Sequence, residues 1–319
     1  MRLCRFSADR EMQIGFYGEE QIVPLAAVSA AYAADRQEQF ELPQSTDLLD
    51  FLPPRGAGHA TTANLFTWFG ENPSKIPGDS AVDPRAVTLH VPIPKPSKLF
   101  LLAGNYAAHI EEGGDVAAER AETFPYVFMK PPSTTLTDPG RPVVIPRISP
   151  DAIDWELELA VVIGGRGRHV PEADALKIVA GYTVINDISN RIFRPNPNRK
   201  KRERDRFFDW LHGKWFDSFC PCGPCLTAAD AVPDPQALDM ELRVNGQVQQ
   251  SASTAQQIFS VAEVIAFVSS IVTLEPGDII STGTAAGVGH AKSMYLKPGD
   301  TITARIEGIG TLTSPVVAE

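Results

Sequence analysis

The sequence predicts a β-rich α+β fold, in which a small N-terminal β unit precedes a larger domain built on a rolled or sandwiched mixed sheet. Three observations lead to this prediction. Residues 154–164 form an apolar strand that carries two glutamates, and residues 180–187 form a second apolar strand that ends in an aspartate. The C-terminal segment alternates Pro-Gly-Asp turns with strands, at 276–282 and 298–306.

The first 95 residues predict a small accessory domain of mostly β structure. The runs 12–17 and 21–25 flank a Gly-Glu-Glu turn and read as two paired strands. A short helix is expected at 46–52, and the two prolines that follow it end the helical pattern. Three prolines in 91–96 stiffen the connection that follows. We therefore predict domains at 1–95 and 96–319.

The second domain begins with an apolar strand at 98–102. Further along, Asn245-Gly246 is the dipeptide typical of a type I′ hairpin turn. Ser260 and Glu263 form the pattern of a capping box, which opens a helix with apolar positions at 264, 265, 267, 268 and 271. These elements are expected to be structural.

Composition limits the class of protein. The chain has 319 residues, a net charge of −10 and a pI near 5.2, which argues against broad binding to nucleic acid or anionic membranes. No stretch approaches the roughly 20 apolar residues of a membrane span, and the start of the chain lacks a signal-peptide core. We expect a cytoplasmic protein with one large domain and one small one.

The strand at 154–164 carries the clearest chemical signal. Glu156 and Glu158 are two residues apart, so their side chains project from one face while Leu157, Leu159 and Val161 project from the other. A solvated sheet face would explain an ordinary Glu-x-Glu strand. Here the strand continues into a fully apolar run, so the carboxylates are expected to be buried and to need a cation. Asp187 can supply a third ligand.

An all-oxygen ligand set of this kind suits a hard ion. Three carboxylates without a nearby His or Cys favour Mg²⁺ or Mn²⁺, with Ca²⁺ also possible, over zinc. The cysteines Cys220, Cys222 and Cys225 do not have the spacing of a paired zinc site and are expected to be reduced thiols without a role in the reaction.

Two further groups are candidates for chemistry. If residues 104–112 turn helical, His109 and Glu112 are i, i+3 neighbours and the glutamate can orient the imidazole, although such pairs are common on exposed surfaces. Lys214 lies among aromatic residues that would desolvate it and shift its pKa toward catalytic use. The basic run 199–206 is either a solvated face or a means of attracting an anionic substrate.

Four motifs together resemble the fumarylacetoacetate hydrolase superfamily, and the likeness covers roughly residues 96–319. They are Glu156-Leu157-Glu158, the segment Asn186-Asp187-Ile188-Ser189-Asn190-Arg191, the segment Gly213-Lys214-Trp215-Phe216-Asp217, and Thr282-Gly283-Thr284-Ala285-Ala286-Gly287-Val288-Gly289. All four occur in family order. Residues 190–194 depart from the usual family pattern, because an Asp and a Gln that many relatives carry there are missing in this chain. The substrate that the family pattern implies is therefore not carried over.

The resemblance implies a metal-dependent enzyme with a C-terminal-domain-like sandwich or roll. It implies that Glu156, Glu158 and Asp187 hold the metal, that His109, Glu112 and Lys214 are catalytic, and that Tyr106, Arg191, Arg194 and Thr284 bind substrate. The expected reaction is hydrolysis of a C–C bond in acylpyruvates or related 2,4-dioxo acids. A homodimer is expected, since relatives are commonly dimeric.

The same enolate chemistry leaves alternatives open. They are a 2-oxo-acid decarboxylase, an isomerase or tautomerase, and a hydratase or dehydratase. A non-catalytic metal-dependent binding protein is a further alternative, against which the apparent base His109 with Glu112 and Lys214 argues. A small anionic 2-oxo acid is the expected partner in each enzymatic case.

Overall fold

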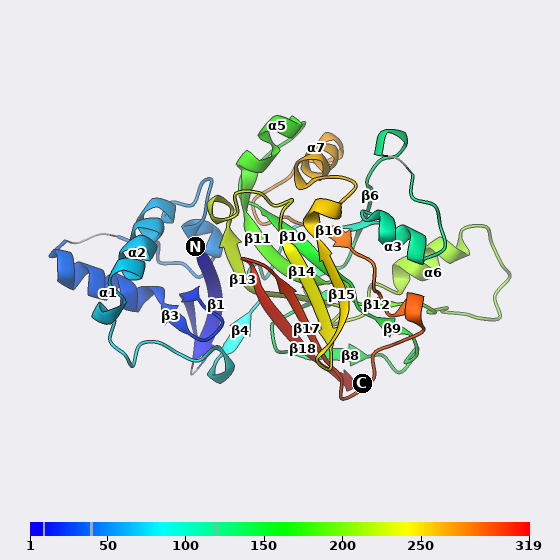
Figure 1. Cartoon of the computed structure of the whole chain (residues 1–319), viewed down its shortest axis with the longest axis horizontal. Helices are drawn as coiled ribbons and strands as arrows, with labels where there is room; N and C mark the ends of the chain where they lie inside the picture. Colours follow the sequence, from blue (N-terminus) through cyan, green and yellow to red (C-terminus); the bar gives the residue numbers. More distant parts are fainter. Residues whose placement is uncertain (9, 39–40, 119) are drawn as a thin grey trace.

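The fold was analysed as a computed structural model, which describes residues 1–8, 10–38, 41–118 and 120–319. Two sheets face each other in the larger part of the molecule (Figure 1), as the predicted β-rich α+β class requires. The larger sheet has the strand order β3-β2-β1-β13-β11-β10-β16-β5-β6, and the smaller has the order β15-β14-β17-β18-β8. No helix within the described residues is long and apolar enough to cross a bilayer.

The strands of the larger sheet come from both halves of the sequence. Short strands β4 (Thr88–His90) and β7 (Leu136–Thr137) pair with β1 and β13 beside the main path. The strands on that path are β1 (Arg2–Ala8), β2 (Glu11–Tyr17), β3 (Ile22–Pro24), β5 (Leu99–Ala103), β6 (Tyr126–Met129), β10 (Leu157–Ile163), β11 (Val179–Asn186), β13 (Cys220–Ala228) and β16 (Ile279–Thr284).

The smaller sheet is made mainly from the C-terminal part of the chain. Its strands are β8 (Val143–Ile145), β14 (Asp239–Val244), β15 (Gln247–Ser253), β17 (Thr301–Ile306) and β18 (Gly310–Ala318). The predicted Asn245-Gly246 turn joins β14 to β15, and both of its residues have the positive φ of a type I′ turn. A separate two-stranded sheet pairs β9 (Ile153–Asp154) with β12 (Ser189–Asn190).

Helices lie around these sheets. The predicted capping box is formed by Ser260 and Glu263 at the start of α7. The helices are α1 (Leu25–Arg36), α2 (His59–Glu71), α3 (Ala107–Glu112), α4 (Pro132–Thr135), α5 (Glu172–Ala175), α6 (Asp205–His212) and α7 (Val261–Ile271). The short helix expected at 46–52 is a 3₁₀ turn at Leu48–Phe51.

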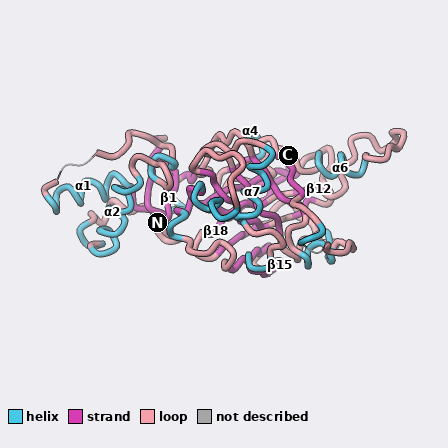
Figure 2. The backbone as a smooth tube through the Cα atoms, turned by 90° about the horizontal axis from the view of Figure 1, so that it is seen from above, coloured by secondary structure: helices cyan, strands magenta, loops and turns pink. Residues whose placement is uncertain are grey.

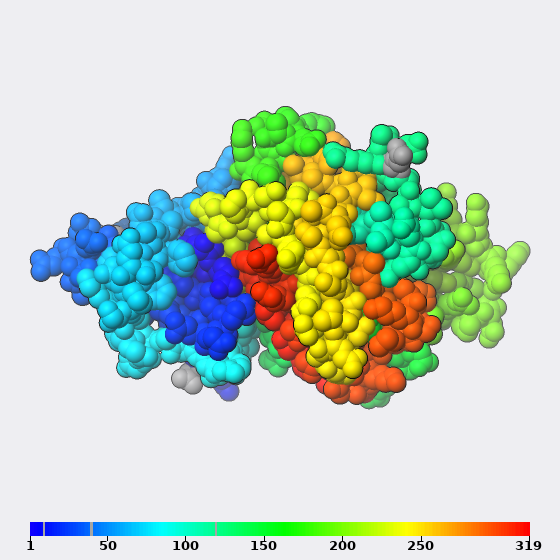
Figure 3. Space-filling view, viewed as in Figure 1, coloured from blue at the N-terminus to red at the C-terminus, as the bar shows by residue number. Residues whose placement is uncertain are grey.

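The N-terminal unit joins the larger sheet directly, because Arg2 of β1 pairs with Thr227 of β13. Helices α1 and α2, which the sequence analysis did not predict, form its outer side and protrude at the left of Figure 1 and of the space-filling view in Figure 3. The boundary proposed at 95/96 falls between β4 and β5, and the division into two domains stays a prediction.

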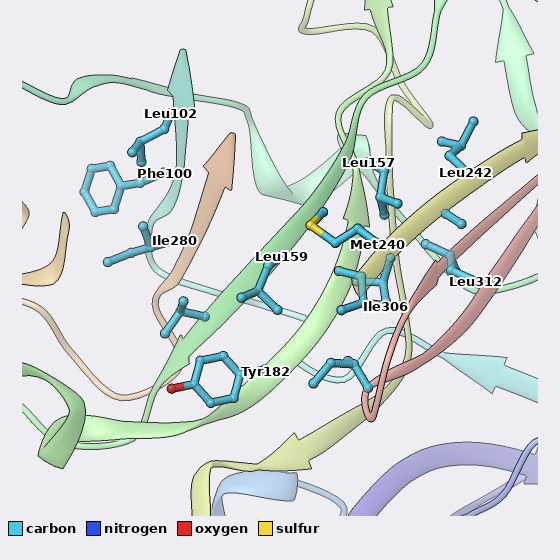
Figure 4. Packing of buried hydrophobic residues seen from close by; sticks show 14 of the residues in the cluster. Phe100, Leu102, Leu157, Leu159, Tyr182, Met240, Leu242, Ile280, Ile306 and Leu312 are labelled. Atoms are coloured by element: carbon cyan, nitrogen blue, oxygen red, sulfur yellow. The ribbon is translucent and has the colours of Figure 1, made fainter. Parts of the chain in front are cut away.

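Strand β10 separates two apolar clusters. Leu157, Leu159 and Val161 face the smaller sheet and pack there against residues such as Met240 and Leu312 (Figure 4). Ala160 and Val162 face the opposite way, into a cluster that reaches the N-terminal unit. The strand is therefore buried on both faces. In Figure 2 the strands lie mainly in the middle of the molecule, with helices and loops around them.

Candidate active site

Three buried carboxylates meet where β10 and β11 lie side by side. Glu156 immediately precedes β10, Glu158 is in β10, and Asp187 follows the last residue of β11. The two strands pair antiparallel, and the backbone N–H of Asp187 donates to the carbonyl of Glu156 over 2.8 Å. One oxygen of each carboxylate lies within 4.8 Å of the others. The sequence-based grouping of these three residues thus corresponds to a compact set of ligand atoms.

Glu158 has one engaged and one free oxygen. Its Oε2 accepts hydrogen bonds from Ser281 Oγ (2.6 Å) and from the backbone N–H of Gly283 (3.0 Å). Its Oε1 is buried without a hydrogen-bond partner in the described structure. Burial raises the pKa of Glu158 well above its usual value, and the neighbouring Asp187 and Glu156 raise it further. A buried carboxylate oxygen without a partner is a position for a bound cation.

Protein cations surround the other two carboxylates. Lys214 Nζ donates to Glu156 Oε2 (2.7 Å) and to Asp187 Oδ2 (2.6 Å). Lys130 Nζ lies 2.5 Å from Asp187 Oδ1, and Arg191 Nη2 lies 2.5 Å from Glu156 Oε1 as an ion pair. The buried carboxylates were expected to need a cation and a metal was proposed, but these three side-chain cations already pair with Glu156 and Asp187.

The carboxylate set nevertheless fits a hard divalent ion. A carboxylate oxygen has more than one lone pair, so Glu156 and Asp187 can accept from Lys214 and still ligate a metal. The free Glu158 Oε1 provides the third donor, and all three donors are oxygens. The group can therefore hold a metal ion, and it is the one group of clustered metal-ligating side chains in the part of the chain that the structure describes.

Lys214 is buried as predicted, but its pKa moves in the other direction. Its Nζ lies 5.2 Å from the ring centroid of Phe128 and 5.6 Å from that of Trp210. Burial alone would lower the pKa of Lys214, yet Asp187 and Glu156 outweigh this effect and raise it. The expected shift toward a neutral amine is wrong for this structure. Lys214 is an ammonium donor, suited to holding negative charge rather than to accepting a proton.

Glu156 remains ionised for a related reason. Burial opposes its charge, but Arg191, Lys214 and His109 outweigh burial and hold the pKa of Glu156 well below its usual range. The Gly-rich segment links the carboxylate group to the His109–Glu112 pair, because the backbone N–H of Gly283 donates to Glu158 and that of Gly287 donates to Glu112. The predicted base and the predicted metal ligands are therefore joined through one segment of the chain.

His109 and Glu112 form the predicted pair on helix α3. His109 Nδ1 lies 2.8 Å from Glu112 Oε1, at the i, i+3 spacing, and both side chains are about one-fifth exposed. The carboxylate accepts from Nδ1–H, which leaves Nε2 unprotonated in the neutral imidazole. The pair can therefore act as an oriented general base at the edge of the buried carboxylates.

The Gly-rich segment at the end of β16 and directly after it binds carboxylates of the protein itself. The backbone N–H groups of Gly283, Gly287 and Gly289 donate to Glu158, Glu112 and Asp154, respectively. These three amides are therefore occupied by side chains of the protein. Thr284 Oγ1 donates to the Leu157 carbonyl over 2.9 Å, so in this conformation its hydroxyl has no proton to donate to a substrate carboxylate.

The remaining predicted substrate contacts differ in their surroundings. Tyr106 is 2% exposed, and its hydroxyl contacts Met240 Sδ (3.4 Å) and Gln257 Nε2 (3.3 Å). The Tyr106 side chain therefore lies in the core rather than on an open surface. Arg191 is held by Asp154 as well as by Glu156, so it fixes a predicted metal ligand rather than facing open solvent. Arg194 is exposed in the following loop, where a substrate can reach it.

Sequence reasoning missed Lys130 and Asp154. Lys130 is 1% exposed and, besides Asp187, donates to the carbonyls of Ile188 and Phe219. Its local sequence, the apolar run Tyr126–Met129, did not indicate burial, because lysines are mostly exposed unless they find a buried partner. Asp154 accepts from Arg191 Nε and from the N–H groups of Gly289 and His290, but nothing local to its sequence indicated these partners.

The three clustered cysteines are unpaired thiols in β13, and Cys4 is also free. All four are buried. This agrees with the expectation of reduced thiols, and the metal-ligating group described above does not include them.

Comparison with known families identifies the larger part of the chain. Residues 98–317 match the family described as fumarylacetoacetate (FAA) hydrolase C-terminal. Mitochondrial oxaloacetate tautomerases are similar over 233 residues, with 38% identity for the protein of Rattus norvegicus and 41% for that of Bos taurus. In each case the match covers 72% of this chain and 70% of the relative.

Solved structures resemble the chain over its whole length. Maleylpyruvate hydrolase from Sphingobium sp. SYK-6, in complex with manganese(II) and pyruvate, is 28% identical, covers 100% of this chain and 99% of its own, and has a TM-score of 0.70. A 5-carboxymethyl-2-hydroxymuconate δ-isomerase from Mycobacterium smegmatis is also 28% identical, covers 100% of both chains, and has a TM-score of 0.68.

Proposed function

The chain belongs to the fumarylacetoacetate hydrolase superfamily, and from this premise we propose that it is a metal-dependent enzyme acting on small 2-oxo acids through their enolates. The observation that carries the proposal is the free Glu158 Oε1 within a buried carboxylate group, close to the His109–Glu112 pair. An acid-base pair beside a site for a hard ion suits proton transfer next to a 2-oxo group.

We propose keto–enol tautomerisation of an oxaloacetate-like acid as the leading reaction. The support is the 38–41% identity to oxaloacetate tautomerases, compared with 28% for the maleylpyruvate hydrolase structure. The expectation of C–C hydrolysis in acylpyruvates remains the second candidate. It is favoured by the whole-chain similarity to that hydrolase and by a histidine that can activate water.

Each residue of the site has a proposed role. Glu156, Glu158 and Asp187 would hold the metal, for which we propose Mg²⁺, with Mn²⁺ or Ca²⁺ as alternatives. When bound, such an ion supplies Lewis-acid stabilisation to the carboxylate and 2-oxo oxygens of a substrate. Glu112 orients His109, whose Nε2 takes a proton from the carbon next to the oxo group or from water. Lys214 donates to negative charge that develops on oxygen, and Arg194 attracts the anionic substrate.

The test is a comparison of three reactions on one metal-supplemented preparation. Conversion of enol to keto oxaloacetate, release of pyruvate from acylpyruvates, and release of carbon dioxide from oxaloacetate are measured before and after chelation. Metal-dependent tautomerisation without pyruvate release would support the leading reaction, and metal-dependent pyruvate release would support the second. Absence of metal-dependent turnover in all three assays would contradict the proposal.

We also propose that the protein is a homodimer in a reducing, cytoplasmic setting. Exposed apolar side chains, including Phe124, Tyr126, Phe207 and Ile271, line a groove of about 640 Å³ beside the edge strand β6. Exposed apolar side chains gathered in one groove mark a candidate interaction surface. Residues 199–206 next to this groove are mainly basic in a chain with a net charge of −10. Mass measurement in solution should give a dimer, and Phe207→Ser should weaken it. An unchanged monomer mass would contradict this assignment.

A further inference from the structure

Three side chains outside the carboxylate site form a continuous Ser-His-Asp chain. Ser7 Oγ lies 2.9 Å from His90 Nε2, and His90 Nδ1 lies 3.1 Å from Asp138 Oδ2. The other oxygen of Asp138 accepts the backbone N–H of Val91 over 2.8 Å. These contacts have the order and the distances in which a histidine activates a serine and a carboxylate orients the histidine.

The fold brings the three residues together from separate segments. Strand β4 pairs antiparallel with β1, so that His90 lies opposite Arg5 and Thr88 lies opposite Ser7. Alternate residues of a strand share a face, and Ser7 and His90 therefore project from the same side of the sheet as diagonal neighbours. Asp138 follows β7 and approaches this side from a segment beyond the proposed 95/96 boundary. The arrangement thus depends on segments from both sides of that boundary.

The hydrogen bonds also define the roles of the imidazole nitrogens. Asp138 accepts the proton of Nδ1, so Nε2 of the neutral ring carries the lone pair that faces the Ser7 hydroxyl. The His90 side chain is 21% exposed and that of Asp138 is 28% exposed, which leaves the group accessible to a small molecule. Ser7 is likewise only partly buried.

A fixed positive charge lies next to this group. Arg5 is two residues before Ser7 on the same face of β1, and it is 9% exposed. Its guanidinium is held by the carbonyls of Thr46 (2.9 Å) and Val91 (3.1 Å). A preorganised cation beside a serine is suited to stabilising negative charge on an acyl oxygen.

We propose that Ser7, His90 and Asp138 form a second, metal-independent site that accepts an acyl group from a small ester. Ser7 Oγ forms a bond to the acyl carbon and passes its proton to His90 Nε2. The ester C–O bond breaks, and His90 returns the proton to the departing alcohol oxygen. Water, deprotonated by His90, then attacks the acyl-serine, which releases the carboxylic acid and restores Ser7. This site is independent of the function proposed for the carboxylate group.

The test uses the full chain in excess chelator, so that the carboxylate site does not contribute. A fluorophosphonate probe, read by peptide mass mapping, should modify Ser7. Hydrolysis of p-nitrophenyl acetate should fall about 10²-fold or more in Ser7→Ala and in His90→Gln, the range expected for loss of a general base or its nucleophile. Ser251→Ala, which changes an exposed serine on β15, should keep the wild-type rate.

A further variant distinguishes loss of the Ser-His-Asp arrangement from loss of folding. Asp138→Asn preserves the size of the side chain and can still accept from Val91, but it disfavours the Nδ1–H tautomer of His90. It should reduce labelling of Ser7 while thermal unfolding stays close to wild type. Absence of Ser7 modification, or equal ester hydrolysis in folded wild type and Ser7→Ala, would overturn the proposal and leave these residues as a clamp between β1, β4 and the Asp138 segment.

Discussion

Gly287 donates its backbone N–H to Glu112 Oε2 over 2.8 Å, while the other oxygen of Glu112 binds His109 Nδ1. These bonds join helix α3 to the Gly-rich loop. Gly287 has a φ of 103°, and a Cβ at this position would lie 2.2 Å from the Gln249 carbonyl oxygen, so only glycine fits. Burial disfavours the charge on Glu112, but the bonds from His109 and Gly287 outweigh burial and lower its pKa. The carboxylate therefore stays ionised and keeps the imidazole oriented.

Removal of the base should separate proton transfer from metal binding. We expect His109→Ala to lose roughly 10²- to 10⁴-fold in kcat for tautomerisation or acylpyruvate hydrolysis, because the general base is gone. Glu112→Gln should lose less, since an amide oxygen can still accept from His109 but carries no charge. Oxaloacetate decarboxylation, which does not need an activated water, should fall less than hydrolysis in both variants.

The kinetic comparison is made at saturating metal, with Glu111→Gln as a control that changes the neighbouring exposed acid. Calorimetric Mn²⁺ binding should be similar in all variants. A wild-type rate of both tautomerisation and hydrolysis in His109→Ala would refute the role assigned to this residue.

Glu158→Gln should abolish metal-dependent turnover. The substitution replaces the free carboxylate oxygen with a neutral amide, and loss of even an outer-shell partner commonly weakens metal binding 10- to 100-fold. We expect calorimetric Mn²⁺ affinity to fall by at least about 100-fold, while Glu307→Gln, an exposed control, keeps it. Recovery of turnover on adding Mn²⁺ after removal of Mg²⁺ would agree with this assignment. Full turnover after exhaustive chelation would disprove it.

Local spacing explains which parts of the site could be predicted. The alternation of Glu156 and Glu158 and the i, i+3 spacing of His109 and Glu112 are set by strand and helix geometry, so the sequence alone indicated their relation. Lys130 reaches Asp187 across 57 positions of sequence, and this contact depends on tertiary packing. The engagement of Arg191 by Asp154 is equally non-local.

The fold likewise has parts that local sequence patterns predict and parts that they do not. The alternating C-terminal strands, the Asn-Gly turn and the capping box carry strong local signals, and each was predicted in place. Helices α1 and α2 were overlooked, although the alanine-rich residues 25–36 have high helix propensity. The pairing of β1 with β13 joins residues that are more than two hundred positions apart, and no local pattern encodes such a register.

Lys130→Met should destabilise the protein by about 3–5 kcal/mol, because it removes one partner of a buried ion pair and leaves Asp187 less compensated. The double variant Lys130→Met/Asp187→Asn should recover part of this loss, since the uncompensated charge is also removed. Urea unfolding without added metal measures both. Arg243→Met, which breaks a solvent-screened surface pair with Glu241, should cause only a small loss of stability. A change of that small size in Lys130→Met would contradict the interpretation.

The buried thiols should weaken the fold at alkaline pH. Burial raises the pKa of Cys225 to about 12, compared with about 8.5 for a cysteine in an unfolded chain. A folded pKa above the unfolded one gives stability that is fully present below the unfolded value. Above pH of about 8.5 the unfolded thiol releases its proton while the folded thiol keeps it, so stability declines as pH rises toward about 12, by up to about 1.4 kcal/mol per pH unit for each such thiol.

The measurement is the free energy of urea unfolding between about pH 9 and 10.5, under reducing conditions. Cys225→Ala also loses the hydrogen bond from Sγ to the Ile309 carbonyl (3.2 Å) and leaves a small cavity. Its free energy of unfolding therefore differs from that of the wild type by a constant amount at every pH. Only the slope tests the titration. Because the other buried thiols and the tyrosines are common to both proteins, the wild-type slope should be steeper than that of the variant by about 1.4 kcal/mol per pH unit. Parallel slopes would show that the Cys225 thiol does not contribute to the alkaline loss of stability.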